Sequence, residues 1–248
     1  MKNKTASLLI IGNEILSGKT QDKNLNYIAK KLADMGITFA ETRVVRDITD
    51  EIVSGLNELR RKYDYVFTTG GIGPTHDDIT IDAVAKAFGV KVIVDKEARA
   101  TLEEYYKTRG SELNSARLKM AEFPEGAELI KNPLTAAPGC KIDNVFVLAG
   151  IPSIMQVMFD YASQHLQQGR KIYSEAIYCD LVEGDLAAKL TGIQNNNNST
   201  EIGSYPYVVQ GKYAVSLVVR STDTSAVAKA ASEIKEMITE LGGKVLEE

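Results

Sequence analysis

The sequence has little of what several functional classes require. It holds two cysteines, Cys140 and Cys179, which lie far apart and outside any Cys-x-x-Cys pair. We therefore expect buried free thiols and no zinc or redox motif. Its two histidines, His76 and His165, form no Ser-His or Cys-His arrangement, which argues against a side-chain nucleophile. We expect His165 to be a surface or capping residue.

Long apolar runs and an excess of positive charge are also missing. No stretch approaches the ~20 apolar residues that cross a bilayer, and the run from Leu8 to Ile11 is too short for the core of a signal peptide. The net charge of −4 differs from the basic balance of nucleic-acid-binding proteins. The 248 residues, 44% hydrophobic and 25% charged, have the composition of a globular protein. We expect a cytoplasmic protein without a nucleic-acid or membrane partner.

What the sequence does contain is a glycine-rich turn at residues 70–80, with the sequence GGIGPTHDDIT. It follows the strand-like run 65–69 and precedes the helical pattern 82–88, so it joins a strand to a helix. In α/β sheets ligands bind at the carboxyl ends of strands, and glycines there let backbone N–H groups approach an anion. The nearby Asp77, Asp78 and Asp82 would repel a phosphate unless a divalent cation lay between. The turn therefore predicts phosphoester or phosphoanhydride chemistry.

A plainer interpretation is that the glycines only form a tight turn and that Asp78 or Thr80 caps the next helix. The turn is neither a Gly-x-Gly-x-x-Gly dinucleotide fingerprint nor a P-loop, because no Gly-Lys-Ser/Thr follows. His76 stands beside two aspartates and could ligate a metal or donate to a phosphate oxygen. It could equally have no direct role.

The chain before this turn predicts a strand, a polar loop and two helices. Residues 7–11 are continuously apolar, as in a strand covered on both faces. The loop 12–20 is either a simple connection or a second wall of the cleft, with Asn13 and Glu14 as its polar groups. A helix from about Asp22 to Gly36, a strand at 37–45 and a helix at 49–62 follow. On spacing alone Asp47 is a turn residue.

After the turn, the pattern predicts a strand at 90–94, one helix at 96–120, a turn at 123–126, strands at 127–131 and 145–148, and a helix ending near 168. Residues 132–139 form a loop rich in small residues and proline. A second glycine turn contains Gly150 and Pro152, and we expect it to face the same crevice as residues 70–80. The mixed charges of 96–120 are typical of a solvated helix face.

The best domain boundary lies at 167–169, which divides the chain into residues 1–168 and 169–248. Beyond it we expect a strand at 171–181, a helix at 185–194, two strands around Gln210-Gly211-Lys212 and a helix at 224–241. The sequence therefore predicts a three-layer α/β domain with a mostly parallel sheet, followed by a small α+β domain.

The turn at 70–80 closely resembles the signature of the molybdopterin-binding-like superfamily, which includes the MogA/MoaB-type proteins of molybdenum-cofactor biosynthesis. It is more similar to the N-terminal domain of the CinA (competence-damage) family and to the hydrolase domain of eukaryotic FAD synthetases. Three further motifs match in order: residues 12–18 (GNEILSG), Asn132-Pro133 with 137–139 (APG), and 150–152 (GIP). The resemblance covers residues 5–168, and the remainder fits the family's small extra domain.

The resemblance implies metal-dependent hydrolysis of ADP-ribose or FAD to AMP and a second monophosphate. The implied cofactor is a divalent ion (Co²⁺, Mg²⁺ or Mn²⁺), with K⁺ as a further candidate, and we expect a homo-oligomer. The candidate catalytic groups are Asp47, His76 and Asp78, and the candidate metal ligands are Asp47, Asp77 and Asp78. The candidate substrate-binding residues are Gly12, Asn13, Glu14, Gly70, Gly71, Gly73, Pro74, Thr75, Thr80, Gly150 and Pro152.

The resemblance also marks positions at which this chain departs from its relatives. Thr135-Ala136 stands where they often carry Gly-Thr, and Ile154 where many have glutamate, which shifts the acidic role towards the aspartates. In relatives the 96–120 segment brings basic residues near the cleft, so Arg117 and Lys119 are candidates to hold phosphate. Two other functions stay open: pterin binding or adenylyl transfer in molybdenum-cofactor biosynthesis, and noncatalytic nucleotide binding.

Overall fold

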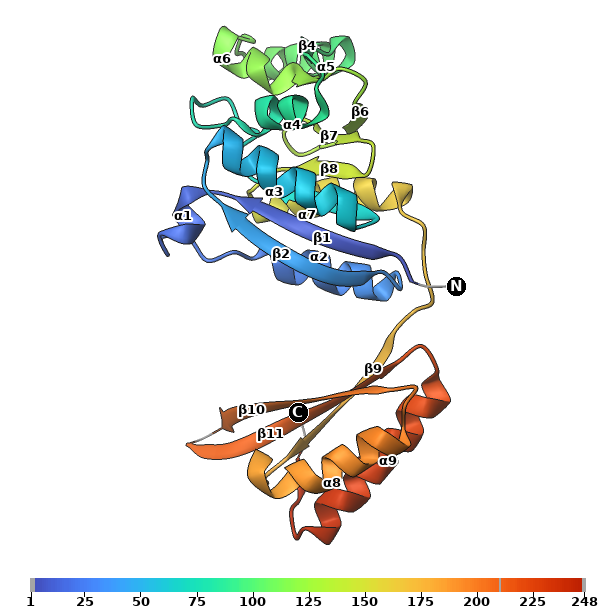
Figure 1. The fold of residues 1–248 in the computed structure, drawn as a ribbon. Helices are drawn as coiled ribbons and strands as arrows, with labels where there is room; N and C mark the ends of the chain where they lie inside the picture. The colour runs from blue at the N-terminus through green and yellow to red at the C-terminus, as the bar shows by residue number, and fades with distance from the viewer. Residues whose placement is uncertain (1–2, 210, 247–248) are drawn as a thin grey trace. The chain divides into compact units, whose positions relative to one another are not determined.

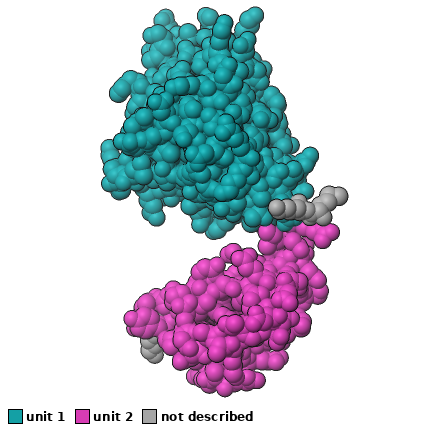
Figure 2. Space-filling model, in the orientation of Figure 1, with its two compact units in different colours: residues 1–169 teal, residues 170–248 magenta. Residues whose placement is uncertain are grey.

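The computed structural model describes residues 3–209 and 211–246, which fold as two compact units: unit 1 extends to Gly169, and unit 2 begins at Arg170 (Figure 2). The expected hairpin turn at Gln210 lies outside the described residues. Within the described ranges, no helix is both long enough and apolar enough to cross a membrane.

Unit 1 is built on a six-stranded sheet with the order β2-β1-β3-β8-β7-β6 (Figure 1). Strands β2 (Thr38–Val45), β1 (Thr5–Ile11), β3 (Tyr65–Thr69) and β8 (Val145–Leu148) are parallel. Strand β7 (Gly139–Ile142) runs antiparallel to β8 and to β6 (Glu128–Ile130). The expected mostly parallel sheet is therefore confirmed, with one reversed strand near its edge.

Helices cover both faces of this sheet, which gives the expected three layers. On one face, α2 (Asn24–Asp34) and α7 (Pro152–Ala162) pack on a core centred on Phe67, Phe146 and Phe159. On the other face, α3 (Thr49–Lys62), α4 (Thr80–Phe88) and α5 (Lys96–Lys107) bury Leu9, Val66 and their neighbours. Because both faces are covered, β1 and β3 are buried along nearly their whole length, including the polar Ser7, Thr68 and Thr69.

The segment after α4 differs from the expectation in two places. The single helix expected at 96–120 is wrong: α5 ends at Lys107, and α6 (Ser115–Leu118) and a 3₁₀ turn, η1 (Lys119–Ala121), follow. Gly110 has a φ of +66°, which breaks the helix, and the Asn114 side chain accepts from the Arg117 N–H to start α6. The turn expected at 123–126 begins within a strand, because β5 (Glu122–Pro124) pairs with β4 (Val92–Val94).

Two short elements complete the fold of unit 1: α1 (Asn13–Leu16) follows β1, and η2 (Ser163–His165) follows α7. Unit 2 is an antiparallel sheet, β10-β11-β9-β12, with two helices on one face. Its elements are β9 (Tyr173–Cys179), α8 (Glu183–Asn196), β10 (Glu201–Val209), β11 (Lys212–Ser221), α9 (Thr224–Glu240) and β12 (Val245–Leu246). The expected small α+β domain is therefore present, with one more strand than expected.

Candidate functional site

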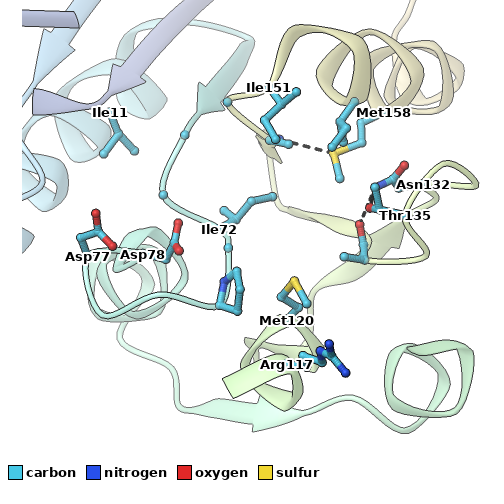
Figure 3. A pocket seen from close by; sticks show the side chains of 18 of the residues that line it. Ile11, Ile72, Asp77, Asp78, Arg117, Met120, Asn132, Thr135, Ile151 and Met158 are labelled. Atoms are coloured by element: carbon cyan, nitrogen blue, oxygen red, sulfur yellow. Dashed lines mark hydrogen bonds between the residues drawn. The ribbon is translucent and has the colours of Figure 1, made fainter. Parts of the chain in front are cut away.

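A cavity of about 920 Å³ opens in unit 1 at the carboxyl ends of β1, β3 and β8 (Figure 3). Ile11 is the last residue of β1, Gly70 follows β3, and Gly150 lies just after β8; all three line the cavity. The position is the one at which open parallel sheets bind ligands. Its volume suits a nucleotide-sized molecule.

Gly70 brings the glycine loop close to the tip of β1. It has a φ of +103°, and a Cβ built on it would lie 2.1 Å from the carbonyl oxygen of Ile11. The Gly70 N–H donates to the carbonyl of Leu148 at 3.3 Å, and its own carbonyl accepts from the Thr80 hydroxyl at 2.9 Å. Thr80 is therefore a buried support beneath the loop and does not line the cavity.

The far end of the loop is closed by Asp78. Its Oδ2 accepts from the Thr75 N–H at 2.8 Å and from the Thr75 hydroxyl. Gly73 leaves room for this carboxylate, since a Cβ there would lie 2.7 Å from Asp78 Oδ2. Asp78 thus organises the loop and also lines the cavity, whereas the capping role considered for Asp78 and Thr80 is wrong, because α4 has no side-chain cap.

Further carboxylates reach the cavity from other segments. Asp47, just after β2, accepts from the Asn13 N–H at 2.8 Å, which ties the two loops together. Glu14 and Asp77 also line the cavity. The Thr75 hydroxyl lowers the pKa of Asp77 below its ordinary value, helped by a backbone N–H and by the charges of His76 and Lys119. Residues 14, 47, 77 and 78 therefore make one part of the cavity acidic.

Two aromatic–guanidinium stacks lie in another part of the cavity wall. The Arg109 guanidinium lies 3.7 Å from the ring centre of Tyr105, and that of Arg117 lies 4.2 Å from the ring centre of Tyr106. All four residues line the cavity. The family resemblance pointed to Arg117, but Tyr105, Tyr106 and Arg109 were not predicted, because the charge pattern of this segment does not show which side chains face the cavity.

Lys119 has a different place from the one expected. Its Nζ donates to the carbonyls of Thr75 at 2.8 Å and Asp78 at 2.6 Å, so it holds the glycine loop from outside and does not line the cavity. Figure 3 shows Asp77 and Asp78 on one side of the cavity, Asn132 and Thr135 on the other, and Ile72 and Met120 between them. Asn132 is buried and donates to the Thr135 hydroxyl at 2.6 Å.

The candidate residues therefore divide into two groups. Those that line the cavity are Glu14, Asp47, Gly70, Gly71, Gly73, Pro74, Asp77, Asp78, Gly150 and Pro152. Those that do not are Gly12, Asn13, Thr75, His76 and Thr80. Asn13 and Thr75 act on Asp47 and Asp78, as described, and the His76 side chain is exposed. The sequence did not predict the apolar part of the cavity wall. This part is formed by Ile72, Met120, Ile151, Ile154 and Met158.

The carboxylates do not form a closed metal cage. Among residues 3–209 and 211–246, no three His, Cys, Asp or Glu side chains gather as a ligand set. Asp47 and Asp78 each already accept backbone hydrogen bonds. Such a site fits an ion of the Mg²⁺ type, which proteins hold through one or two carboxylates together with water and substrate phosphates.

Comparison with known proteins agrees with this geometry. Residues 7–168 match the family described as "Probable molybdopterin binding domain", and residues 171–242 match "FAD synthase, middle domain". The CinA protein of Thermoplasma acidophilum has a solved structure with a TM-score of 0.60 and 35% identity, over 65% of this chain and 96% of that one. The resemblance identified from the motifs is thereby confirmed.

Relatives that match nearly the whole chain support the same family assignment. A protein of Archaeoglobus fulgidus is 31% identical over 94% of this chain and 97% of its own length. A "probable FAD synthase" of Caenorhabditis elegans is 30% identical over 96% of the chain, and a "CinA-like protein" of Kosmotoga olearia 31% identical over 97%. The chain spans 50% of the nematode protein and 60% of the Kosmotoga protein. By fold, motifs and matched sequence, the chain belongs to the molybdopterin-binding-domain family.

Proposed function

We propose that unit 1 hydrolyses the diphosphate bond of a nucleotide such as ADP-ribose or FAD, giving AMP and a second monophosphate. The observation that carries the proposal is a single cavity in which the carboxylates of Asp47, Asp77 and Asp78 accompany the guanidinium groups of Arg109 and Arg117. Guanidinium groups bind phosphate oxygens, and carboxylates can share a cation with them. Similarity to a probable FAD synthase supports a nucleotide as the ligand.

The glycine loop would bind one phosphate through its backbone. Gly70 uses its N–H in the contact with Leu148, but the N–H groups of Gly71, Ile72 and Gly73 have no acceptor within the described part of the chain. Arg109 and Arg117 would hold the other phosphate and neutralise the charge that develops in the transition state. The loop would thus position one phosphate, and the positive charges of the arginines would stabilise the other.

The chemical step is attack by water on one phosphorus of the diphosphate. The new P–O bond forms as the bridging P–O bond breaks, and the electron pair leaves with the second monophosphate. Asp47 and Asp78 are the carboxylates available to accept the proton that water loses. A bound divalent ion would neutralise phosphate charge and lower the pKa of water.

One experiment tests the proposal against its alternatives. The purified full chain is incubated with ADP-ribose, FAD or molybdopterin, with and without Co²⁺, Mg²⁺ or Mn²⁺, and AMP release is followed. AMP together with ribose 5-phosphate or FMN supports hydrolysis. Tight pterin binding without AMP release from ADP-ribose or FAD supports the cofactor-biosynthesis alternative, which the name of the matched family favours. Nucleotide binding without turnover under any metal supports a noncatalytic role.

A further inference from the structure

A second cavity adjoins the first in unit 1. It has a volume of about 1010 Å³ and lies between α5, the segment 127–138 and Tyr161 of α7. Tyr105 and Asn132 line both cavities, so the two spaces share part of their walls. Each cavity alone is large enough for a mononucleotide, and together they exceed what one needs.

The two cavities differ in chemistry. The second is lined by small or apolar side chains, including buried Ala98 and half-buried Leu129 and Pro138, and by the rings of Tyr105 and Tyr161. Its charged groups are mainly acidic: Asp95, Glu97, Glu104 and Glu128 against Lys131. Phosphate is disfavoured in such surroundings, whereas an uncharged planar ring can stack on tyrosine.

The guanidinium groups of Arg109 and Arg117 line only the first cavity. The Arg109 guanidinium stacks 3.7 Å from the Tyr105 ring centre and lines the first cavity only. A diphosphate beside Arg109 would therefore lie close to the wall that the cavities share. One end of the ligand would then contact the first cavity, and the other end would pass Tyr105 into the second.

We propose that the substrate of unit 1 spans both cavities, with its diphosphate near Arg109 and a planar, uncharged ring system in the second cavity. This inference rests on the proposed hydrolase function and narrows its substrate class. It predicts that a dinucleotide with an aromatic ring at each end, such as FAD, is a better substrate than ADP-ribose, whose second end is a bare sugar.

The test is a bulky substitution that reduces the space in the second cavity. Thr101 is exposed on α5 and lines only the second cavity, whereas Lys107, exposed on the same helix, lines neither. Values of kcat/KM for FAD and ADP-ribose are measured for the unmodified chain, Thr101→Trp and the matched control Lys107→Trp. We expect the FAD to ADP-ribose ratio of kcat/KM to fall about tenfold in Thr101→Trp, the effect of losing one stacked ring, and to stay unchanged in Lys107→Trp.

Binding of riboflavin, followed by its fluorescence, provides a readout that does not need turnover. We expect riboflavin to bind the unmodified chain in the presence of AMP and to bind Thr101→Trp about tenfold more weakly. An unchanged FAD to ADP-ribose ratio, or riboflavin binding that AMP abolishes, would overturn the two-cavity inference while leaving hydrolysis intact. If neither FAD nor ADP-ribose is hydrolysed, the proposed function fails, and the riboflavin result alone then decides whether the second cavity binds a ring.

Discussion

The ammonium of Lys119 donates to the carbonyl oxygen of Asp78 at 2.6 Å, across forty-one positions of sequence. A second hydrogen bond, to the carbonyl of Thr75 at 2.8 Å, places the same ammonium at both ends of the loop turn that presents Asp77 and Asp78. The segment that follows α6 thus fixes the acidic part of the cavity without lining it.

Removing this ammonium should impair turnover more than binding. In Lys119→Met the loop loses both hydrogen bonds, and a displacement of about 1 Å at reacting groups can lower the rate ~100-fold. We expect kcat to fall by at least about tenfold with KM changed less. Lys119→Arg should restore part of kcat, and Lys107→Met is the matched control. A rise in KM at constant kcat would show that Lys119 acts on ground-state binding instead.

Asp78 should be essential to turnover but not to the fold. In Asp78→Asn one oxygen can still accept from Thr75, while the charge is lost. We expect kcat to fall ~100-fold or more, with the circular dichroism spectrum and melting temperature nearly unchanged. Asp82→Asn, an exposed position on α4 outside the cavity, is the control. Turnover near wild type in Asp78→Asn would remove this carboxylate from the mechanism.

Metal affinity should depend on a bound nucleotide. Since no three acidic or imidazole groups converge within residues 3–209 and 211–246, the protein alone should bind Mg²⁺ or Co²⁺ weakly. With AMP present, we expect the affinity measured by titration calorimetry to rise at least about tenfold, because phosphate oxygens complete the ligand set. EDTA should abolish hydrolysis, and the metal should restore it. Equal affinity with and without AMP would contradict this shared coordination.

Gly70 should be intolerant of any side chain. Gly70→Ala combines a φ of +103° with a Cβ 2.1 Å from the Ile11 carbonyl. We expect a loss of about 3 kcal/mol in the free energy of unfolding, measured with urea, from strain and backbone displacement together. Gly89→Ala separates the two causes, because Gly89 has a φ of +68° but open space around it. It should cost about 1 kcal/mol, and equal losses in the two variants would refute the steric argument.

The stability of unit 1 should fall in acid through Glu41. Hydrogen bonds from Lys62, Tyr63 and Arg43 lower the pKa of Glu41 from 4.5 to about 2. A lowered folded-state pKa stabilises the protein above pH 4.5 and loses that contribution as the pH falls from 4.5 to about 2. Because Lys62 is solvent-exposed, screening reduces the expected contribution to about 1 kcal/mol at pH 7.

Glu41→Gln tests this contribution. The variant should be less stable than the unmodified chain by about 1 kcal/mol at pH 7, and the difference should vanish near pH 2. Urea unfolding at several pH values measures it, with the exposed Glu125→Gln as a control that changes little. A difference that does not depend on pH would mean that packing, and not charge, is lost.

The sequence predicted the fold of unit 1 well where the patterns are strong. The apolar run at 7–11 predicted a strand covered on both faces, the strand-like run at 65–69 predicted β3, and residues of the glycine-containing turns after both strands line the cavity. Prediction failed where tertiary pairing decides the structure. Strand β7 was missed because Gly139–Ile142 follows a loop rich in proline and small residues and lacks a continuous apolar run like that of β8. Strand β5 was missed because it contains Pro124.

The site was predicted from charge and glycine but not from aromatic or apolar side chains. Asp78 lies in the glycine turn, whereas Asp47 is a turn residue on spacing alone and became a candidate only through the family resemblance. Tyr105 and Arg109 belong to a mixed-charge helix end, whose direction depends on the break at Gly110. Lys119 was a candidate phosphate ligand because relatives carry basic residues in this segment. Its contact with the loop was not predicted, because its carbonyl partners, Thr75 and Asp78, are distant in sequence.

Each compact unit encloses one of the two thiols: Cys140 on β7 of unit 1 and Cys179 on β9 of unit 2, both with 0% exposure. Burial raises the pKa of Cys140 to about 12 and also raises that of Cys179. An alkylating reagent can reach either sulfur only when the surrounding unit opens. The chain therefore carries two built-in reporters of local unfolding, and mass spectrometry of the alkylated peptides would show which unit opens first.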